Sequence, residues 1–205
     1  MLYRLRPYKY LFFALSMAVL TLFAVKFIQS NQHNEHAFKS FQKHLINKLK
    51  MVEDAGNSLI SDKEPEIDFK AFNKNDIVVI IYKNDSLQYW SENALSIPVY
   101  FPDSLPEKEL VKTGNLWCIP YIYKHNSEKY IFFVKIKYAY PYENPYLENS
   151  FAKGFHLSVN HSILQQPQES SRSVFDGHGN YLFSLQFNGL VLIIGSQPFD
   201  LIFST

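Results

Sequence analysis

The sequence predicts an α+β protein that an amino-terminal helix anchors in a membrane. Three observations support this fold class: an apolar run at residues 11–28, a helical apolar period at residues 36–62, and strand-like segments separated by turn residues within residues 70–187. Three expected hairpins with helices before and between them are typical of α+β domains. A doubly wound parallel sheet would instead need long helices between single strands.

Residues 11–28 (LFFALSMAVLTLFAVKFI) contain no acid and a single base, Lys26. As a helix the run spans about 27 Å, close to the roughly 30 Å hydrocarbon core of a bilayer. Three bases and no acid precede it, so the positive-inside rule predicts that residues 1–10 are cytoplasmic and that the chain after the span is exported. The main alternative is a cleaved signal peptide, but the run is longer than the usual apolar region and ends without a small-x-small site. The same bases disfavour a buried core helix.

Composition indicates one packed domain after the anchor. Apolar residues make up 47% of the chain and aromatic residues 17%, which favours a core over disorder. Of the 20 bases, four lie in residues 1–28, where there is no acid, so the exported part is slightly acidic and nucleic acid is not an expected partner. Cys118 is the only cysteine, and its apolar surroundings predict a buried, inert thiol.

After a polar break at Ser30–Glu35, residues 36–62 predict an amphipathic stalk helix that ends near Gly56-Asn57 or by Asp62. Two interpretations of its apolar stripe are open. The stripe packs on its own domain, or it pairs with the same helix of a second subunit in a homodimer. The stripe consists of Phe38, Phe41, Leu45, Leu49, Val52 and Leu59.

The next segments predict two hairpins. Residues 77–82 are an apolar, mostly β-branched run typical of a strand buried on both faces, and residues 87–90 return after a turn. Residues 116–123 and 130–138 form the second pair. Pro120 predicts an edge position or a bulge, because proline cannot donate to a ladder. Lys135 and Lys137 alternate with apolar residues, which indicates one solvated face.

A short helix and a third hairpin follow. Asn144 and Pro145 are the preferred cap and first residue of a helix. Residues 173–176 and 181–185 flank the sequence Gly177-His178-Gly179-Asn180, whose glycines suit a tight reversal.

No catalytic constellation is recognisable, so no enzyme activity and no cofactor are expected. The sequence contains no G-x-S-x-G, glycine-rich phosphate loop or H-E-x-x-H. His33 and His36 could share a helix face, but no further ligands complete a metal site, and we expect them to be solvated.

The most unusual local sequence is the tyrosine-rich stretch YAYPYENPY at residues 138–146. Aromatic rings bind small apolar or cationic groups well, so these side chains are the candidates for a small-molecule site. The favoured alternative is that they cap the core of the sheet, because tyrosine is often half buried for structural reasons. The candidate ligand-binding residues are Tyr138, Tyr140, Tyr142, Tyr146 and Trp90.

With these elements placed, the chain resembles the extracytoplasmic sensing region of bacterial membrane-bound two-component histidine kinases. The resemblance covers about residues 11–187 and rests on several spaced segments. They are YWSEN at residues 89–93 with Ile97-Pro98, KIKYAYPYENPYL at residues 135–147, VFD at residues 174–176 and GNYLFSL at residues 179–185.

This resemblance implies an inner-membrane protein with a cytoplasmic amino terminus and a periplasmic PAS-like or Cache-like sensor domain at residues 70–187. It also implies a dimer, a return span and cytoplasmic kinase domains. The kinase activity cannot be assigned to any residue, because no phosphoacceptor His-Glu or His-Asp pair and no nucleotide-binding glycine boxes follow the domain. The expected function is therefore signal sensing without catalysis. The alternative is a stand-alone exported adaptor or structural protein that binds another envelope protein.

The apolar tail at residues 188–205 begins like a second span, but Gln197-Pro198 and Asp200 interrupt it. An aspartate at the centre of a bilayer costs about 2.5–3.5 kcal/mol, so we expect an incomplete transmembrane segment. A terminal strand is the alternative. We also expect the chain to be a shortened sensor, which an intact kinase in another reading frame downstream would establish.

Overall fold

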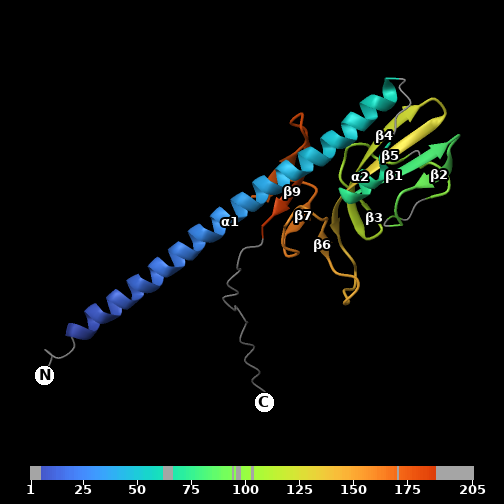
Figure 1. Cartoon of the computed structure of the whole chain (residues 1–205). Coiled ribbons are helices and arrows are strands. Elements are labelled where there is room, and N and C mark those ends of the chain that lie inside the picture. Colours follow the sequence, from blue (N-terminus) through green and yellow to red (C-terminus); the bar gives the residue numbers. More distant parts are fainter. Residues whose placement is uncertain are drawn as a thin grey trace, which may run out of the picture.

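The computed structural model confirms an α+β architecture, in which one long helix is followed by antiparallel sheets (Figure 1). The predicted tail at residues 188–205 lies outside the described part of the chain. The described residues are 6–61, 67–93, 95, 98–102, 104–169 and 171–187.

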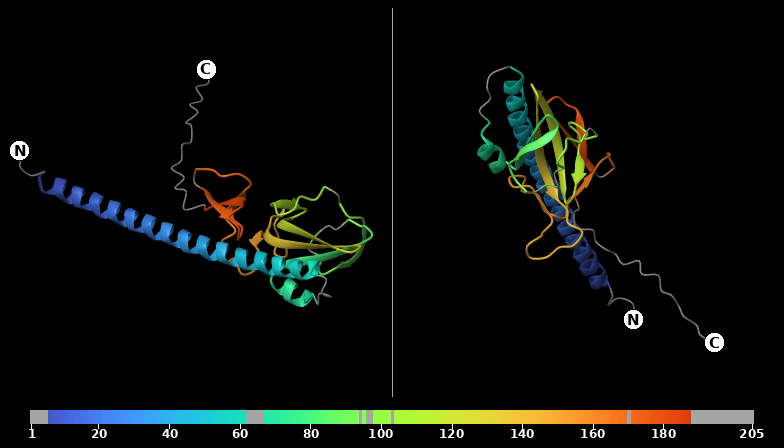
Figure 2. Two further views of the ribbon diagram at one scale, coloured as in Figure 1. Left: turned by 90° about the horizontal axis from the view of Figure 1, so that it is seen from above. Right: turned by 90° about the vertical axis from the view of Figure 1, so that its right-hand side faces the viewer.

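Helix α1 spans Arg6–Ile60 as one uninterrupted element (Figures 1 and 2). Its amino-terminal half is long and apolar enough to cross a membrane and is exposed to its surroundings, although a signal sequence would satisfy the same criteria of length and composition. The predicted break at Ser30–Glu35 is wrong, because the helix continues through it. These polar residues include no glycine or proline. Each destabilises a helix by less than about 0.7 kcal/mol relative to alanine, which is too little to end it.

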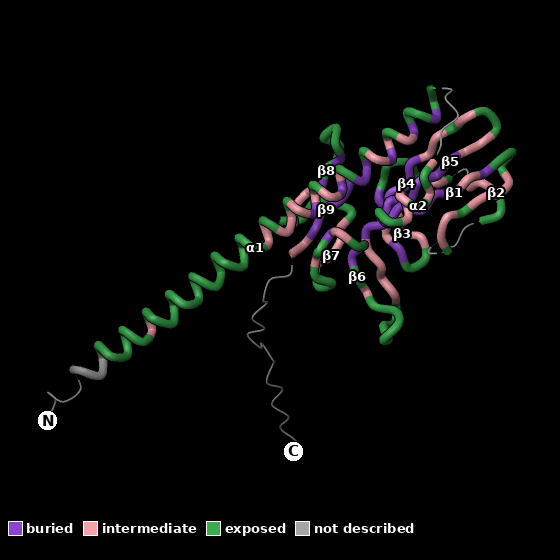
Figure 3. Tube along the Cα trace, in the orientation of Figure 1, coloured by how far each residue is buried: buried purple, intermediate pink, exposed green. Residues whose placement is uncertain are grey.

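The carboxyl-terminal half of α1 packs on its own domain, where Figure 3 shows the change from exposed to buried positions along the helix. Of the predicted stripe, all but Phe38 are fully buried in the main core, and Phe38 packs against its border. The structure thus places this stripe inside one subunit. The buried members are Phe41, Leu45, Leu49, Val52 and Leu59.

The larger sheet has six strands in the order β2-β1-β5-β4-β3, with β6 paired to the end of β5. Asp68 caps the short helix α2 (Phe69–Lys74), which precedes β1, by accepting a hydrogen bond from the Ala71 backbone N–H. Asn84 and Asp85 both have positive φ in the β1–β2 turn, the geometry of a type I′ reversal. The strands are β1 Ile77–Lys83, β2 Ser86–Trp90, β3 Val111–Thr113, β4 Leu116–His125, β5 Glu128–Tyr138 and β6 Ser150–Phe151.

Two cores lie on the two faces of this sheet. The first holds the α1 stripe against one set of alternate residues, among them Val79 and Phe132. The second holds the other set, among them Ile80 and Phe133, beneath the segment that connects β2 to β3. Burial of both faces explains the apolar run of β1. Cys118 lies in the second core as a buried free thiol, as predicted.

A smaller sheet, in the order β7-β9-β8, lies against the middle of α1 (Figure 1). It corrects the expectation of one sheet built from three hairpins, because β8 and β9 pair outside the larger sheet. Arg172 binds Glu35 of α1, and Gln42 donates a hydrogen bond to the Phe175 carbonyl. The strands are β7 Ser162–Leu164, β8 Ser171–Phe175 and β9 Tyr181–Gln186.

The expectations for Pro120 and for a helix at Asn144-Pro145 have different outcomes. β4 lies between β5 and β3, but Pro120 comes after the last residue that pairs with β3, so its missing N–H costs no ladder hydrogen bond. Its carbonyl accepts a hydrogen bond from the Lys108 N–H. The predicted helix at Asn144-Pro145 is wrong. The Asn144 side chain does accept hydrogen bonds from Tyr146 and Leu147 N–H, but only a turn forms. The first turn of a helix is costly to form and is stabilised only when further turns follow it. Strand β6 begins at Ser150, which leaves too few residues for further turns.

Candidate functional site

The structure brings together two of the five predicted ligand-binding residues. The rings of Tyr138 and Tyr140 are parallel, with centroids 6.1 Å apart, at the end of β5. Tyr142 and Tyr146 are instead 87% and 94% exposed on the loop between β5 and β6. Trp90 is half exposed and does not line the cavity described next, but its indole N–H donates to Asn93 Oδ1 at 2.7 Å. Trp90 thereby orients a side chain that does line it.

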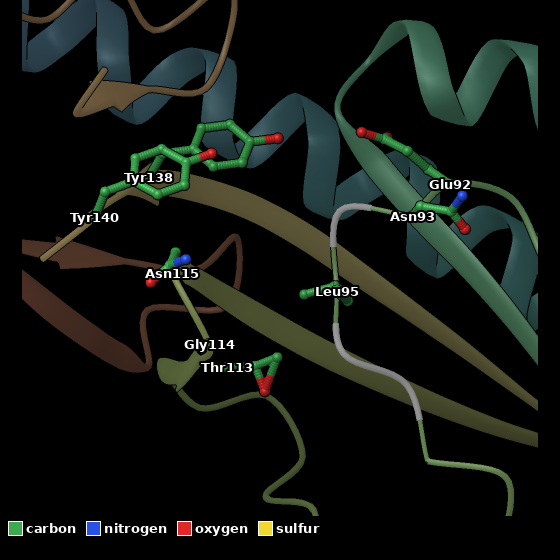
Figure 4. Close-up of a pocket in the computed structure, with 8 residues that line it drawn as sticks. All are labelled: Glu92, Asn93, Leu95, Thr113, Gly114, Asn115, Tyr138 and Tyr140. Carbon is green, nitrogen blue, oxygen red and sulfur yellow. The ribbon is translucent and has the colours of Figure 1, made fainter. Parts of the chain in front are cut away.

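Tyr138 and Tyr140 line a cavity of about 710 Å³, which we call the tyrosine cavity. Figure 4 shows the two tyrosines across from Glu92 and Asn93. Three segments form its walls: the chain after β2, the β3–β4 turn and the end of β5. The lining residues are Glu92, Asn93, Leu95, Thr113, Gly114, Asn115, Tyr138 and Tyr140.

A row of four alternating charges connects this cavity to α1. Glu92 Oε2 lies 2.8 Å from Lys135 Nζ, and Lys135 Nζ lies 3.5 Å from Asp76 Oδ1. The other oxygen of that carboxylate, Asp76 Oδ2, lies 3.5 Å from Lys48 Nζ on α1. We call Glu92, Lys135, Asp76 and Lys48 the charge row. Its formal charge is zero, which stabilises the three side chains that are no more than 10% exposed, those of Lys135, Asp76 and Lys48.

The charge row corrects the prediction of a solvated face on β5. Lys135 is only 3% exposed. Lys137 is half buried and donates hydrogen bonds to the carbonyls of Val159 and His161. An alternation of lysines with apolar residues normally indicates one wet face, but here the segment after β2 covers that face and supplies Glu92 as the partner of Lys135.

Asp76 sits between the two lysines because of its backbone. Its φ of 56° places it in the left-handed region, which aspartate tolerates better than most residues, directly after α2 and before β1. Its N–H donates to the Asn73 carbonyl, and its own carbonyl accepts from the Lys135 N–H at 3.0 Å. The carboxylate is thereby held at the end of the sheet, where side chains from both faces reach it.

Burial and charge pairing set the protonation of these groups. Burial lowers the pKa of Lys135, but the hydrogen bond to Glu92 and the nearby carboxylates outweigh this effect, and the pKa lies above its usual value. Burial lowers the pKa of Lys48, and Asp76 only partly opposes it. Burial also raises the pKa of the Tyr138 hydroxyl, despite the nearby Lys135 ammonium. Tyr138 is therefore a neutral hydroxyl group in the cavity wall at neutral pH.

A second, more apolar cavity of about 300 Å³ adjoins the first. The two share Leu95 and Thr113, and the second extends under the prolines of the β2–β3 connection toward Ile80 and Phe133. Together they offer an aromatic and polar surface beside an apolar one. Such a combination suits the binding of a small molecule.

The chemistry of the tyrosine cavity is that of recognition. Amides of Asn93 and Asn115 can donate and accept hydrogen bonds, and the tyrosine rings offer flat apolar faces. Within the described residues, no group of three or more His, Cys, Asp or Glu side chains could hold a metal ion.

The sequence did not predict that Asn93 and Asn115 line a site, nor that Glu92, Lys135, Asp76 and Lys48 form a row of ion pairs. The one local signal was Lys135, a charged residue that directly follows the apolar run at residues 130–134 of β5. A lysine there needs a buried acid as its partner, but nothing in the sequence identifies which acid.

No protein-family model matches the chain, and no curated protein or solved structure matches it either.

Proposed function

We propose that this chain is a membrane-anchored extracytoplasmic sensing module, of the kind that serves two-component histidine kinases, and that it binds a small polar molecule. The observation that carries this proposal is the continuity of α1. One helix begins with an exposed apolar segment of membrane-spanning length and ends inside the core of the domain. Because no turn or linker separates the two halves, a change of packing on the domain moves the membrane segment directly.

The proposed sensing domain is PAS-like or Cache-like and periplasmic. An antiparallel sheet with α1 on one face and two cavities on the other supports this assignment. The cavities lie beneath the β2–β3 connection, away from α1, so a ligand can enter without displacing the helix.

In this proposal the charge row connects ligand binding to α1. A ligand that makes hydrogen bonds to Glu92 weakens the hold of Glu92 on Lys135, and Lys135 then draws the Asp76 carboxylate away from Lys48 of α1. A ligand shifts a conformational equilibrium only as far as it binds two states unequally. Here the inequality is the ligand's hydrogen bonding to Glu92, which is stronger in the state where Glu92 has moved away from Lys135.

A thermal-shift screen of the full chain in detergent against small metabolites and sugars tests this function. We expect a stabilising ligand whose effect is lost when both cavity tyrosines are replaced, as Tyr138→Ala and Tyr140→Ala. The matched control replaces the two exposed tyrosines of the adjoining loop, as Tyr142→Ala and Tyr146→Ala, and should keep the full response. Equal loss in both double variants, or no stabilising compound for the wild type, would contradict a ligand site at the tyrosine cavity.

The second candidate function is a stand-alone adaptor that binds another envelope protein. The exposed side chains of Tyr142, Tyr146 and Leu147 favour it, because they form an aromatic loop tip that no described residue covers. Under this function, crosslinking in cells captures one envelope protein. The loop double variant then loses that protein, while the cavity double variant keeps it.

A homodimer through α1 is part of the sensing proposal. The residues from Phe41 to Leu59 of the stripe are occupied inside one subunit, so a second copy would meet α1 nearer the membrane, before Phe38. This arrangement combines the two interpretations of the stripe: one end packs on the domain and the other on a partner.

A further inference from the structure

A further cavity, of about 260 Å³, lies on the α1 side of the domain and shares only Lys48 with the groups described above. Three segments meet there: the middle of α1, the end of α2 and the chain after β6. We call it the basic cavity. Its polar side chains are His44, Asn47, Lys48, Lys74, Asn75 and Lys153.

Positive charge in the basic cavity exceeds what its surroundings neutralise. Three lysines line it, and no carboxylate is among the described residues that do so. The acid that pairs with Lys48 is Asp76, and it divides its two oxygens between Lys48 and Lys135. Lys74 and Lys153 are exposed and add two further charges at the rim. This concentration contrasts with the slightly acidic composition of the exported part.

Lys48 is poorly satisfied for a buried ammonium. Its side chain is 8% exposed. Its Nζ lies 3.5 Å from Asp76 Oδ2 and 3.4 Å from the Lys153 carbonyl oxygen, whereas charge-assisted hydrogen bonds are about 2.7–2.9 Å long. Its other contact is the face of the Phe155 ring, whose centroid is 4.6 Å from Nζ. An additional acceptor in the cavity would complete the coordination of this ammonium group.

We propose that the basic cavity binds a small oxyanion of the phosphate or sulfate class. Three ammonium groups supply the charge. The Asn47 amide adds N–H donors, and so does the Asn75 amide, one of whose two N–H groups donates to the Ala71 carbonyl. A volume of about 260 Å³ accommodates such an anion with its first water molecules. The bound anion links α1 to α2 and to the chain after β6, so it fastens the helix to its domain.

The position of the site on α1 favours a free anion over the phosphate of a lipid. Lys48 lies 20 residues beyond Ile28, which is about 30 Å along a helix. The headgroup layer adds only about 5–8 Å on each side of the hydrocarbon core. A lipid phosphate at that surface therefore does not reach the cavity.

Calorimetric titration of the full chain in phosphatidylcholine nanodiscs with inorganic phosphate, at constant ionic strength, tests this inference without reference to the tyrosine cavity. We expect one saturable site per chain. The double variant Lys74→Gln with Lys153→Gln should bind at least tenfold more weakly. The matched control, Lys43→Gln with Lys50→Gln, removes the same charge from exposed positions of α1 outside the cavity and should stay within twofold of the wild type.

Different results would overturn the site itself and its assignment to a free anion. No saturable phosphate binding to the wild type, or equal weakening in the two double variants, overturns the site. A second titration in nanodiscs containing phosphatidylglycerol should give the same phosphate affinity. Competition by that anionic lipid would overturn the assignment to a free anion. A failed ligand screen at the tyrosine cavity leaves all these readings unchanged, because the titration measures phosphate directly.

Discussion

At the scale of single residues, Asp176 holds the turn that brings the smaller sheet onto α1. Its Oδ1 accepts hydrogen bonds from the N–H groups of His178 and Asn180, and its Oδ2 accepts from the Asn180 side chain. Burial raises the pKa of this carboxyl, but the hydrogen bonds outweigh burial and bring the pKa below its usual value of 3.8. Gly179, with a φ of 87°, completes the reversal.

We predict that Asp176→Asn lowers the free energy of unfolding by about 1–3 kcal/mol at pH 7, because charge-assisted hydrogen bonds are replaced by weaker ones. A carboxyl whose pKa is lowered by folding stabilises the fold above its unfolded pKa, and this contribution is lost as the pH falls through the folded value. The variant should therefore lose less stability than the wild type between pH 5 and the acid limit. Urea denaturation across this range measures both effects.

The control for this prediction is Asp54→Asn, a change at an exposed position of α1. It should leave both the stability at pH 7 and the acid dependence close to those of the wild type. An Asp176→Asn protein with unchanged acid dependence would show that the turn does not depend on the charged carboxylate.

At the scale of elements, the distance between α1 and the larger sheet depends on Gly56. Glycine near the expected end of a helix suggests a terminator, but here the helix continues to Ile60 and Gly56 is buried. A Cβ atom at this position would lie 2.1 Å from the Tyr123 ring of β4. The absence of a side chain is therefore a packing requirement.

Gly56→Ala should lower the free energy of unfolding by about 1–3 kcal/mol, the usual cost of overpacking, although alanine raises helix propensity by about 1 kcal/mol. Chemical denaturation monitored by circular dichroism measures the change. Combining Gly56→Ala with Tyr123→Ala removes the obstructing ring, so the glycine substitution should cost far less in that background. A single variant as stable as the wild type would mean that the Tyr123 ring moves aside without loss.

At the scale of the whole molecule, α1 joins the domain to a segment long and apolar enough to cross a membrane, and the proposed topology places that domain outside the cytoplasm. A reporter active only in the periplasm, fused after Phe187, should be active, and a reporter active only in the cytoplasm should be silent. The untagged protein should remain in the membrane fraction at its full mass of 24.0 kDa. An active cytoplasmic reporter would refute export, and a mass reduced by removal of the apolar segment would identify a signal sequence.

The amino-acid sequence by itself determined the elements whose signals are local. The apolar run predicted the membrane-length helix segment, the β-branched run predicted β1, and turn residues predicted the reversals around Asn84 and Gly179. Cys118 was predicted as a buried thiol and is one. Side-chain periodicity and turn preferences depend only on residues close together in the sequence. They therefore predict an element without knowledge of the segments that pack against it.

The tertiary structure alone decided which surfaces meet. The α1 stripe is occupied by its own domain, β8 and β9 form a separate sheet, and Lys135 is buried against Glu92. Of the predicted site, only Tyr138 and Tyr140 share a cavity, and the rest of its wall comes from segments distant in sequence. The physical reason is that burial and ion pairing are properties of contacts between distant segments. A local pattern shows that a side chain needs a partner, whereas only the folded chain determines which partner it receives.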